Sequence, residues 1–211
     1  MNEEQAVLNF FPQPENFPLA FSVAEQMDAI RLRMNNEFWR QASTRISELV
    51  PDWRVTLTED RNTPDCYVGL HLQPIMEQNI YLRPMLEQQV TEGEMRIYFG
   101  LMWSAPPATG KATLDTITSL HEKLQREGCK SNDNFLAWRW TSLYPRRKHL
   151  LLQFSAQPDE LISGAIAPLL DLLTRYTTEL HLANSALCDE ATNPAISLDQ
   201  LRINLQPKKN S

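Results

Sequence analysis

The segment Met95–Trp103 limits most narrowly what this chain can fold into. If it is a strand, its side chains alternate between two faces, because strand side chains repeat every two residues. Met95, Ile97, Phe99, Leu101 and Trp103 then share one face, and Arg96, Tyr98, Gly100 and Met102 share the other. Since both faces carry apolar or aromatic groups, the segment is predicted to be a central strand rather than an edge strand.

A long helix is predicted before this strand. Apolar residues recur at three- and four-residue steps from Val23 to Leu49, which is typical of an amphipathic helix of about seven turns. Ser22 and Glu25 are expected to form a capping box at its start, and Pro51 to end it.

Two further helical segments are predicted later in the chain. Apolar spacing over Leu114–Leu124 indicates one helix, with Gly128 placed to cap its C-terminus. Pro158 is expected to start the last helical region, which is rich in leucine. Pro168 either kinks this region or starts a second helix within it.

Strand-like alternation occupies most of the remaining chain. Trp53–Leu57, Cys66–Leu72 and Ile80–Arg83, the last ended by Pro84, are expected to join the central strand in an antiparallel meander. A later pair of strands is predicted at Phe135–Leu143 and His149–Phe154, joined by a turn over residues 144–148.

These segments predict an α+β fold. The expected order is helix, four strands, helix, two strands, helix, with an antiparallel sheet of about six strands and the helices on one face. Residues 1–20 are interpreted as a proline-rich apolar arm, extended because Pro12, Pro14 and Pro18 disfavour a helix. Residues 21–188 form the single domain, and residues 189–211 a C-terminal tail.

Length, composition and cysteine usage limit the class of protein. The 211 residues suffice for one domain with a sizeable core. No apolar run approaches the ~20 residues of a membrane span, and the acidic start lacks the form of a secretory signal. Cys66, Cys129 and Cys188 are odd in number and widely separated, which favours reduced thiols. A cytoplasmic protein that does not bind membranes is therefore expected.

No catalytic residue, metal ligand or cofactor site is predicted. The segment 105–113 between a strand and a helix carries alanine where a phosphate loop needs its first glycine and its Ser or Thr. The four histidines form no HxxxH pattern, the cysteines form no CxxC pattern, and no GxSxG elbow occurs. With only six glycines and a net charge of −6, phosphate-binding functions are disfavoured overall.

One basic and aromatic cluster nevertheless suits nucleic acid. Trp138 and Trp140 share a strand face with Arg139 between them, and the following turn adds Arg146, Arg147 and Lys148. Aromatic rings that stack on bases beside arginines that hold phosphates are typical of single-strand binding. The alternative is a pair of core tryptophans followed by an ordinary charged hairpin tip.

A surplus of apolar residues points to a protein partner. Phe10, Phe11 and Phe17 lie in the predicted arm, and Leu169, Leu172, Leu173 and Tyr176 form a stripe on the last helix. A helix that is apolar on more than one face either lies between other elements or covers a partner. These seven residues are candidates for a partner-binding surface, in another protein or in a homo-oligomer, with burial in the core as the alternative.

Part of the chain resembles a known superfamily. Arg96–Leu101, the helix after it, Phe135–Tyr144 and the long terminal helix resemble the region that follows the catalytic core in some bacterial PD-(D/E)xK nuclease superfamily proteins. The resemblance covers about half of the chain. Asp52 and Asp65 each follow a proline, but no (D/E)xK comes after them, and Glu94-Met95-Arg96 is the nearest match. The resemblance therefore implies an accessory module without nuclease chemistry.

The element order also resembles, in topology alone, the small acidic chaperones of type III secretion. The leading expectation is a non-enzymatic, protein-binding α+β module: an adaptor, chaperone-like protein or complex subunit, of the kind found in bacterial or phage defence or secretion assemblies. The alternative is a nucleic-acid-binding accessory module related to nucleases. A hydrolase would require a polar pocket that contains a carboxylate or imidazole of strongly perturbed pKa.

Overall fold

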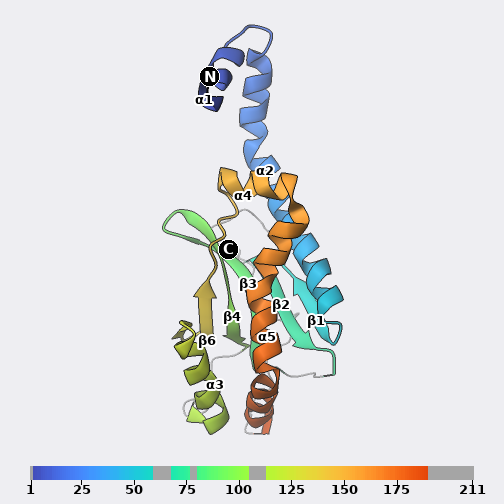
Figure 1. The fold of residues 1–211 in the computed structure, drawn as a ribbon, viewed down its shortest axis with the longest axis vertical. Helices are drawn as coiled ribbons and strands as arrows, with labels where there is room; N and C mark the ends of the chain where they lie inside the picture. Colours follow the sequence, from blue (N-terminus) through green and yellow to red (C-terminus); the bar gives the residue numbers. More distant parts are fainter. Residues whose placement is uncertain (1, 59–67, 77–79, 105–112, 190–211) are drawn as a thin grey trace, which may run out of the picture.

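The segment Met95–Trp103 lies in a central strand of the sheet, as the alternation of its side chains predicts. The structure, a computed structural model, describes residues 2–58, 68–76, 80–104 and 113–189. Its helices are α1 (Glu3–Phe10), α2 (Phe17–Leu49), α3 (Asp115–Arg126), α4 (Lys148–Ala156) and α5 (Pro158–Asp189). Its strands are β1 (Trp53–Leu57), β2 (Val68–Pro74), β3 (Leu82–Thr91), β4 (Glu94–Trp103), β5 (Lys130–Asn132) and β6 (Phe135–Trp140). Figure 1 shows this arrangement.

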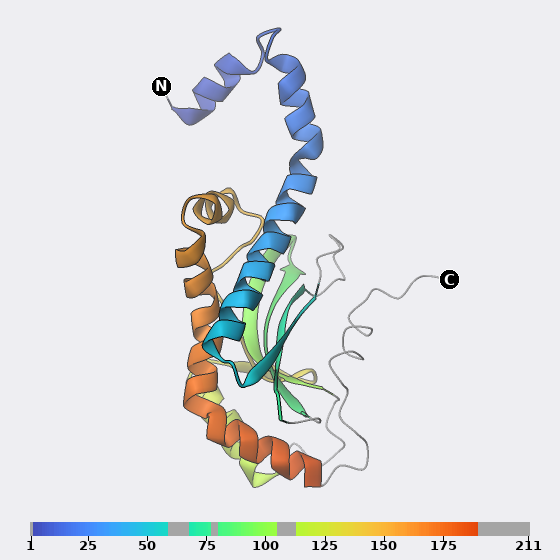
Figure 2. The ribbon, with the colours of Figure 1, turned by 90° about the vertical axis from the view of Figure 1, so that its right-hand side faces the viewer.

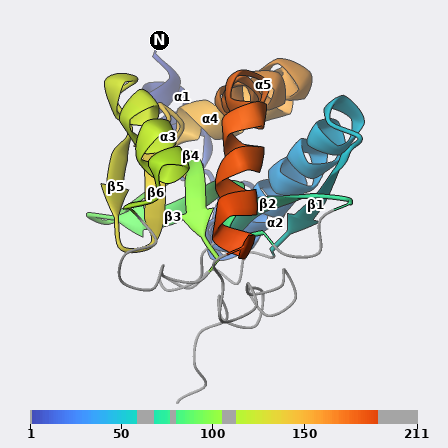
Figure 3. The same cartoon turned by 90° about the horizontal axis from the view of Figure 1, so that it is seen from below.

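All neighbouring strands of the sheet are antiparallel, in the order β1-β2-β3-β4-β6-β5. β4 pairs with β3 on one side and β6 on the other, so the prediction of a central strand is confirmed. The helices that pack on the sheet lie on one face of it (Figure 3), and α1 lies beyond the sheet (Figure 2). The α+β class and the predicted order of strands and helices are confirmed.

The core lies between this face and the helices. Ile97, Phe99 and Leu101 project from β4 into the core, where Ile117, Leu120 and Leu124 of α3 also lie. Gly128, after α3, has φ +84°, a conformation that costs glycine little, and its N–H donates to the carbonyl of Gln125. The predicted cap is therefore correct.

The leucine stripe of α5 belongs to this core. Leu169, Leu172, Leu173 and Tyr176 are 0–8% exposed and join the side chains beneath the sheet. Core burial, the alternative given above, accounts for their apolar character, and they offer no exposed surface to a partner. α5 continues through Pro168, and its backbone departs from helical geometry at Tyr176.

The expectation of an extended N-terminal arm is wrong. α1 occupies Glu3–Phe10 and α2 begins at Phe17, before the predicted capping box. Pro12 and Pro14 lie in the turn between the two helices, and Pro18 lies in the first turn of α2, where its missing N–H costs nothing. The prolines separate two helices, and they interrupt neither. Ser22 is inside α2, where its hydroxyl donates to the carbonyl of Pro18 at 3.1 Å.

Three strand assignments also differ from the prediction. The segment 149–154 is part of α4, and the partner of β6 is β5, joined to it by a tight turn. β6 ends at Trp140 rather than Leu143. β3 continues past Pro84 to Thr91, paired there with β4. Its pairing with β2 extends only to Met85, since proline has no N–H to offer a second neighbour.

Several predicted features lie outside the described residues. They are Cys66, the turn over residues 60–65, the loop over residues 106–110 and almost all of the tail over residues 189–211. No helix in the described ranges is both long and apolar enough to cross a membrane.

Candidate functional site

The N-terminal hook is the most unusual surface of the molecule. We use this name for residues 2–34, which comprise α1, the turn after it and the first half of α2. The hook extends beyond the sheet and the other helices (Figure 2), and none of its side chains is buried. Burial along α2 begins at Asn35 and continues with Phe38 and Trp39.

Most of the exposed apolar surface lies on this hook. Thirteen large apolar side chains are exposed in the described part of the chain, and eight of them belong to the hook. These eight, 37–59% exposed, are Val7, Leu8, Phe10, Phe17, Leu19, Phe21, Val23 and Ile30. The predicted partner-binding residues Phe10 and Phe17 are among them, whereas Phe11 is half-buried.

Local interactions give the hook its shape. The side chain of Asn2 accepts the N–H of Gln5 at 2.8 Å and caps α1. The Asn16 side-chain amide donates to the carbonyl of Phe10 at 3.0 Å across the turn. Phe17 and Phe21 contact edge-to-face with centroids 5.0 Å apart. These contacts hold the two helices in a bend but leave the rings accessible.

An exposed ion pair joins the hook to the domain. Lys148, the first residue of α4, lies 2.8 Å from Glu3. Both side chains are mainly exposed, and an ion pair in solvent contributes little stability. The position of the hook therefore depends on the continuity of α2.

The predicted nucleic-acid-binding residues are only partly brought together. Trp138 and Trp140 share the sheet face opposite the helices, half-buried and edge-to-face at 5.3 Å. Lys130 lies 5.6 Å from the centre of the Trp138 ring, and Arg96 lies 4.5 Å from that of Trp140. These cations already contact the ring surfaces on which a base would stack.

The basic residues predicted beside the tryptophans have partners within the chain. Arg139 lies on the opposite sheet face, over Phe99, and donates to the carbonyl of Glu127 at 2.8 Å. One guanidinium nitrogen of Arg147 lies 2.7 Å from both oxygens of Glu94, and Lys148 pairs with Glu3. Much of the expected positive charge is therefore compensated. Arg146 is exposed.

Sequence reasoning missed the cations that do lie beside the tryptophans. The alternation of β4 places Arg96 on the face of Tyr98, so its proximity to an aromatic cluster was readable from the sequence. The proximity of Lys130 to Trp138 could not be inferred in this way, because the strand that contains Lys130 was not predicted.

A cavity of about 690 Å³ lies where β6 meets α4 and α5. Three of the predicted residues, Arg139, Trp140 and Arg147, line it, together with His149 and Glu160. This volume suits a small ligand. The lining mixes cationic, aromatic and acidic groups, and Arg147 in it is already paired with Glu94.

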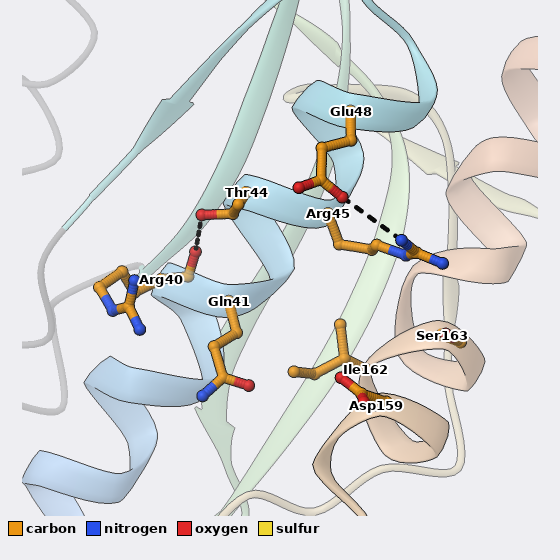
Figure 4. A pocket seen from close by; sticks show the side chains of 8 residues that line it. All are labelled: Arg40, Gln41, Thr44, Arg45, Glu48, Asp159, Ile162 and Ser163. Carbon is orange, nitrogen blue, oxygen red and sulfur yellow. Dashed lines mark hydrogen bonds and ion pairs between the residues drawn. The ribbon is translucent and has the colours of Figure 1, made fainter.

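A second, smaller cavity of about 430 Å³ lies between α2 and α5 (Figure 4). Arg45 lies 3.3 Å from Glu48 across one helical turn. Beside the cavity, hydrogen bonds from Arg40, then from Gln41, lower the pKa of Glu37 to about 2. That carboxylate stays ionised at neutral pH and cannot act as a general acid. The groove is a solvated face of paired charges.

A buried polar network lies on the sheet face opposite the helices. The imidazole Nε2 of His71 is 3.0 Å from one oxygen of Glu87, and the hydroxyl of Tyr98 donates to the other. All three side chains are at most 2% exposed, so a substrate has no access to them. The network connects three neighbouring strands, since β2, β3 and β4 each supply one member.

No group of three or more metal-ligating side chains occurs within the described ranges. Comparison of the chain with protein-family models, with curated proteins and with solved structures finds no match. The resemblance to the nuclease superfamily therefore remains a prediction from the residues quoted above.

Proposed function

We propose that this chain is a protein-binding module, an adaptor or complex subunit, whose partner packs on the N-terminal hook. The observation that carries the proposal is the concentration of eight exposed, large apolar side chains on a segment that buries none. A concentration of exposed apolar side chains of this kind is typical of interaction sites.

The available area is sufficient for a specific interface. A large aromatic side chain can bury roughly 150–250 Å², and three of the eight half-exposed side chains are aromatic, so the eight together offer on the order of several hundred Å². Standard interfaces bury about 800 Å² on each partner. The hook and the polar groups around it together reach this size. Phe10, Phe17 and Phe21 are the expected anchors, since aromatic residues are enriched among those that dominate binding.

Site-specific photo-crosslinking in the cells that naturally produce the chain tests this function. A photoreactive residue at Leu19, on the hook, should form an adduct with one defined protein. The same residue at Leu182, exposed on α5, is the matched control and should not. The double variant Phe10→Ser, Phe21→Ser should abolish the Leu19 adduct. Equal adducts from both positions, or none from Leu19, would contradict the proposal.

A second candidate function is the binding of single-stranded nucleic acid at the larger cavity. It is favoured by the convergence of Arg139, Trp140 and Arg147 on one opening. Fluorescence anisotropy with a labelled oligonucleotide tests it, because phosphate contacts make affinity strongly salt-dependent. Salt-sensitive binding lost in Arg139→Ala would support this function. The absence of such binding at low ionic strength would exclude it.

A further inference from the structure

We infer that the partner presents a basic amphipathic helix to the hook. This inference rests on the proposed function and adds the chemistry of the partner. It comes from two observations: the distribution of charge along the chain, and the course of one stripe of side chains along α2.

Most of the net charge of the chain lies in its first thirty residues, the part of the hook that precedes Arg31 and Arg33. Residues 1–30 contain five of the 26 acidic residues and none of the 20 Lys and Arg residues, so they account for five of the six net negative charges. The acids, all exposed, are Glu3, Glu4, Glu15, Glu25 and Asp28. An apolar surface surrounded by acids is complementary to an apolar surface surrounded by lysine and arginine.

Three of these carboxylates are available to a partner. Glu3 pairs with Lys148, and Asp28 with Arg31 at 3.3 Å. Glu4, Glu15 and Glu25 make no ion pair with any residue that the structure describes. Their charge is therefore uncompensated where the apolar side chains are most exposed.

One stripe of side chains along α2 is buried in the domain over the second half of the helix and exposed over the first half. Steps of three and four residues place Asn35, Trp39, Ala42 and Ile46 on one face, and all four are buried where α2 packs beside α4 and α5. The same steps lead back to Asp28, Glu25, Phe21 and Phe17, which are all exposed. The buried half of the stripe packs against both helices and the sheet, where Trp39 donates to the side chain of Gln88 on β3. The element that contacts α2 most is the helix α5, so a helix is the element expected to cover the other half.

The distribution of charge also disfavours the other occupants of this surface. Two copies of the hook would bring ten acidic residues together, opposed only by Arg31 and Arg33 at the base of each copy, and like charges across an interface are costly. Anionic lipid surfaces would repel the hook for the same reason. A helix that carries leucine on one face and lysine or arginine beside it meets both the apolar and the acidic groups.

The test uses two labelled helical peptides of about 18 residues with the same leucine face, one with lysine and one with glutamate as polar residues. Fluorescence anisotropy with the full chain should show the lysine peptide binding roughly tenfold or more tightly than the glutamate peptide. The preference should shrink between about 50 and about 300 mM salt as screening increases. The triple variant Glu4→Gln, Glu15→Gln, Glu25→Gln should lose most of the preference for the lysine peptide.

The matched control is Glu92→Gln, Glu122→Gln, Asp133→Asn, which removes as much charge from exposed positions outside the hook and should keep the preference. Equal binding of both peptides would overturn the inference, while the Leu19 adduct would still establish protein binding. Binding of neither peptide would also overturn it. A dimer seen by light scattering, and dissociated by Phe10→Ser, Phe21→Ser, would identify a second copy as the occupant instead.

Discussion

Asn184 shows how much a single polar side chain contributes to this fold. Its carbonyl oxygen accepts the N–H groups of Tyr81 and Leu82 at 2.8 and 2.9 Å, and its amide donates to the carbonyl of Leu82 at 3.2 Å. Asn184 lies near the end of α5, so one side chain fixes that end of the helix against the start of β3. It was not predicted, since its partners are about a hundred residues away in the chain.

Replacing Asn184 with alanine should therefore be costly. The substitution leaves backbone groups of Tyr81 and Leu82, at the start of β3, without this partner, and each buried unpaired group costs about 1–3 kcal/mol. We expect Asn184→Ala to lower the free energy of unfolding by about 2–4 kcal/mol in chemical denaturation. Ser185→Ala, at the adjacent exposed position, should have little effect. Equal stability of the two variants would show that these hydrogen bonds contribute nothing net.

The lowered pKa of Glu37 predicts how the stability of the fold depends on pH. Hydrogen bonds from Arg40, then from Gln41, lower its pKa from 4.5 to about 2. A carboxyl group with a lowered folded-state pKa stabilises the fold above its unfolded pKa, and this contribution is lost as the pH falls from about 4.5 to about 2. Carbon-13 NMR should place the midpoint of Glu37 near 2. Arg40→Ala should raise it toward 4.5, whereas Arg126→Ala, at a distant position on α3, should not. An unchanged midpoint in Arg40→Ala would contradict this assignment.

At the scale of elements, the short apolar segments were the hardest to assign. His149–Phe154 carries four apolar residues without a clear period, and such segments fit a strand or a helix equally well. In the structure it forms α4, with Leu150 and Phe154 one turn apart and buried, and Leu152 exposed. The β5–β6 turn had a local signal: the Asn132 side chain accepts the N–H groups of Asn134 and Phe135, as turn-forming asparagines do.

Two glycines should respond in opposite ways to alanine. At Gly100 in β4, a Cβ atom would lie 2.1 Å from the carbonyl oxygen of Ala137, in the rigid backbone of β6. We expect Gly100→Ala to destabilise the protein by roughly 1–3 kcal/mol or more. A Cβ atom at Gly164, on α5, would meet nothing within 4 Å, so Gly164→Ala should stabilise it by about 0.5–1 kcal/mol. Thermal denaturation of both variants checks the pair, and a neutral Gly100→Ala would show that β4 and β6 can separate easily.

At the scale of the whole molecule, the domain and the hook differ in the interactions that hold them in place. The domain is held by side chains from α2, α3, α4, α5 and the sheet in one core. The hook contributes no buried side chain, and its ion pair to α4 is exposed.

Removal of residues 1–30 should therefore leave the domain intact. We expect the free energy of unfolding to change by less than about 1 kcal/mol, because an exposed ion pair contributes at most that much. Denaturant unfolding followed by circular dichroism measures the change. Loss of a cooperative transition would mean that the hook is part of the folding unit.

The sequence by itself determined the elements whose pattern is local and long. The alternation of β4 predicted its central position, and the three- and four-residue steps predicted most of α2 and the inward face of α3. Such patterns suffice because period follows directly from backbone geometry. The helix cap at Gly128 was equally predictable from the sequence, since it depends only on neighbouring residues.

Only the tertiary structure decided which apolar residues are covered. Leu169 and Phe10 are both apolar residues on helices, yet one is fully buried in the core and the other is half exposed on the hook. Their local sequences do not separate these outcomes, because burial depends on which distant elements pack against a given face. The candidate binding surface is therefore defined by where the domain ends along α2, and the recurrence of apolar residues extends over both the buried and the exposed part of that helix.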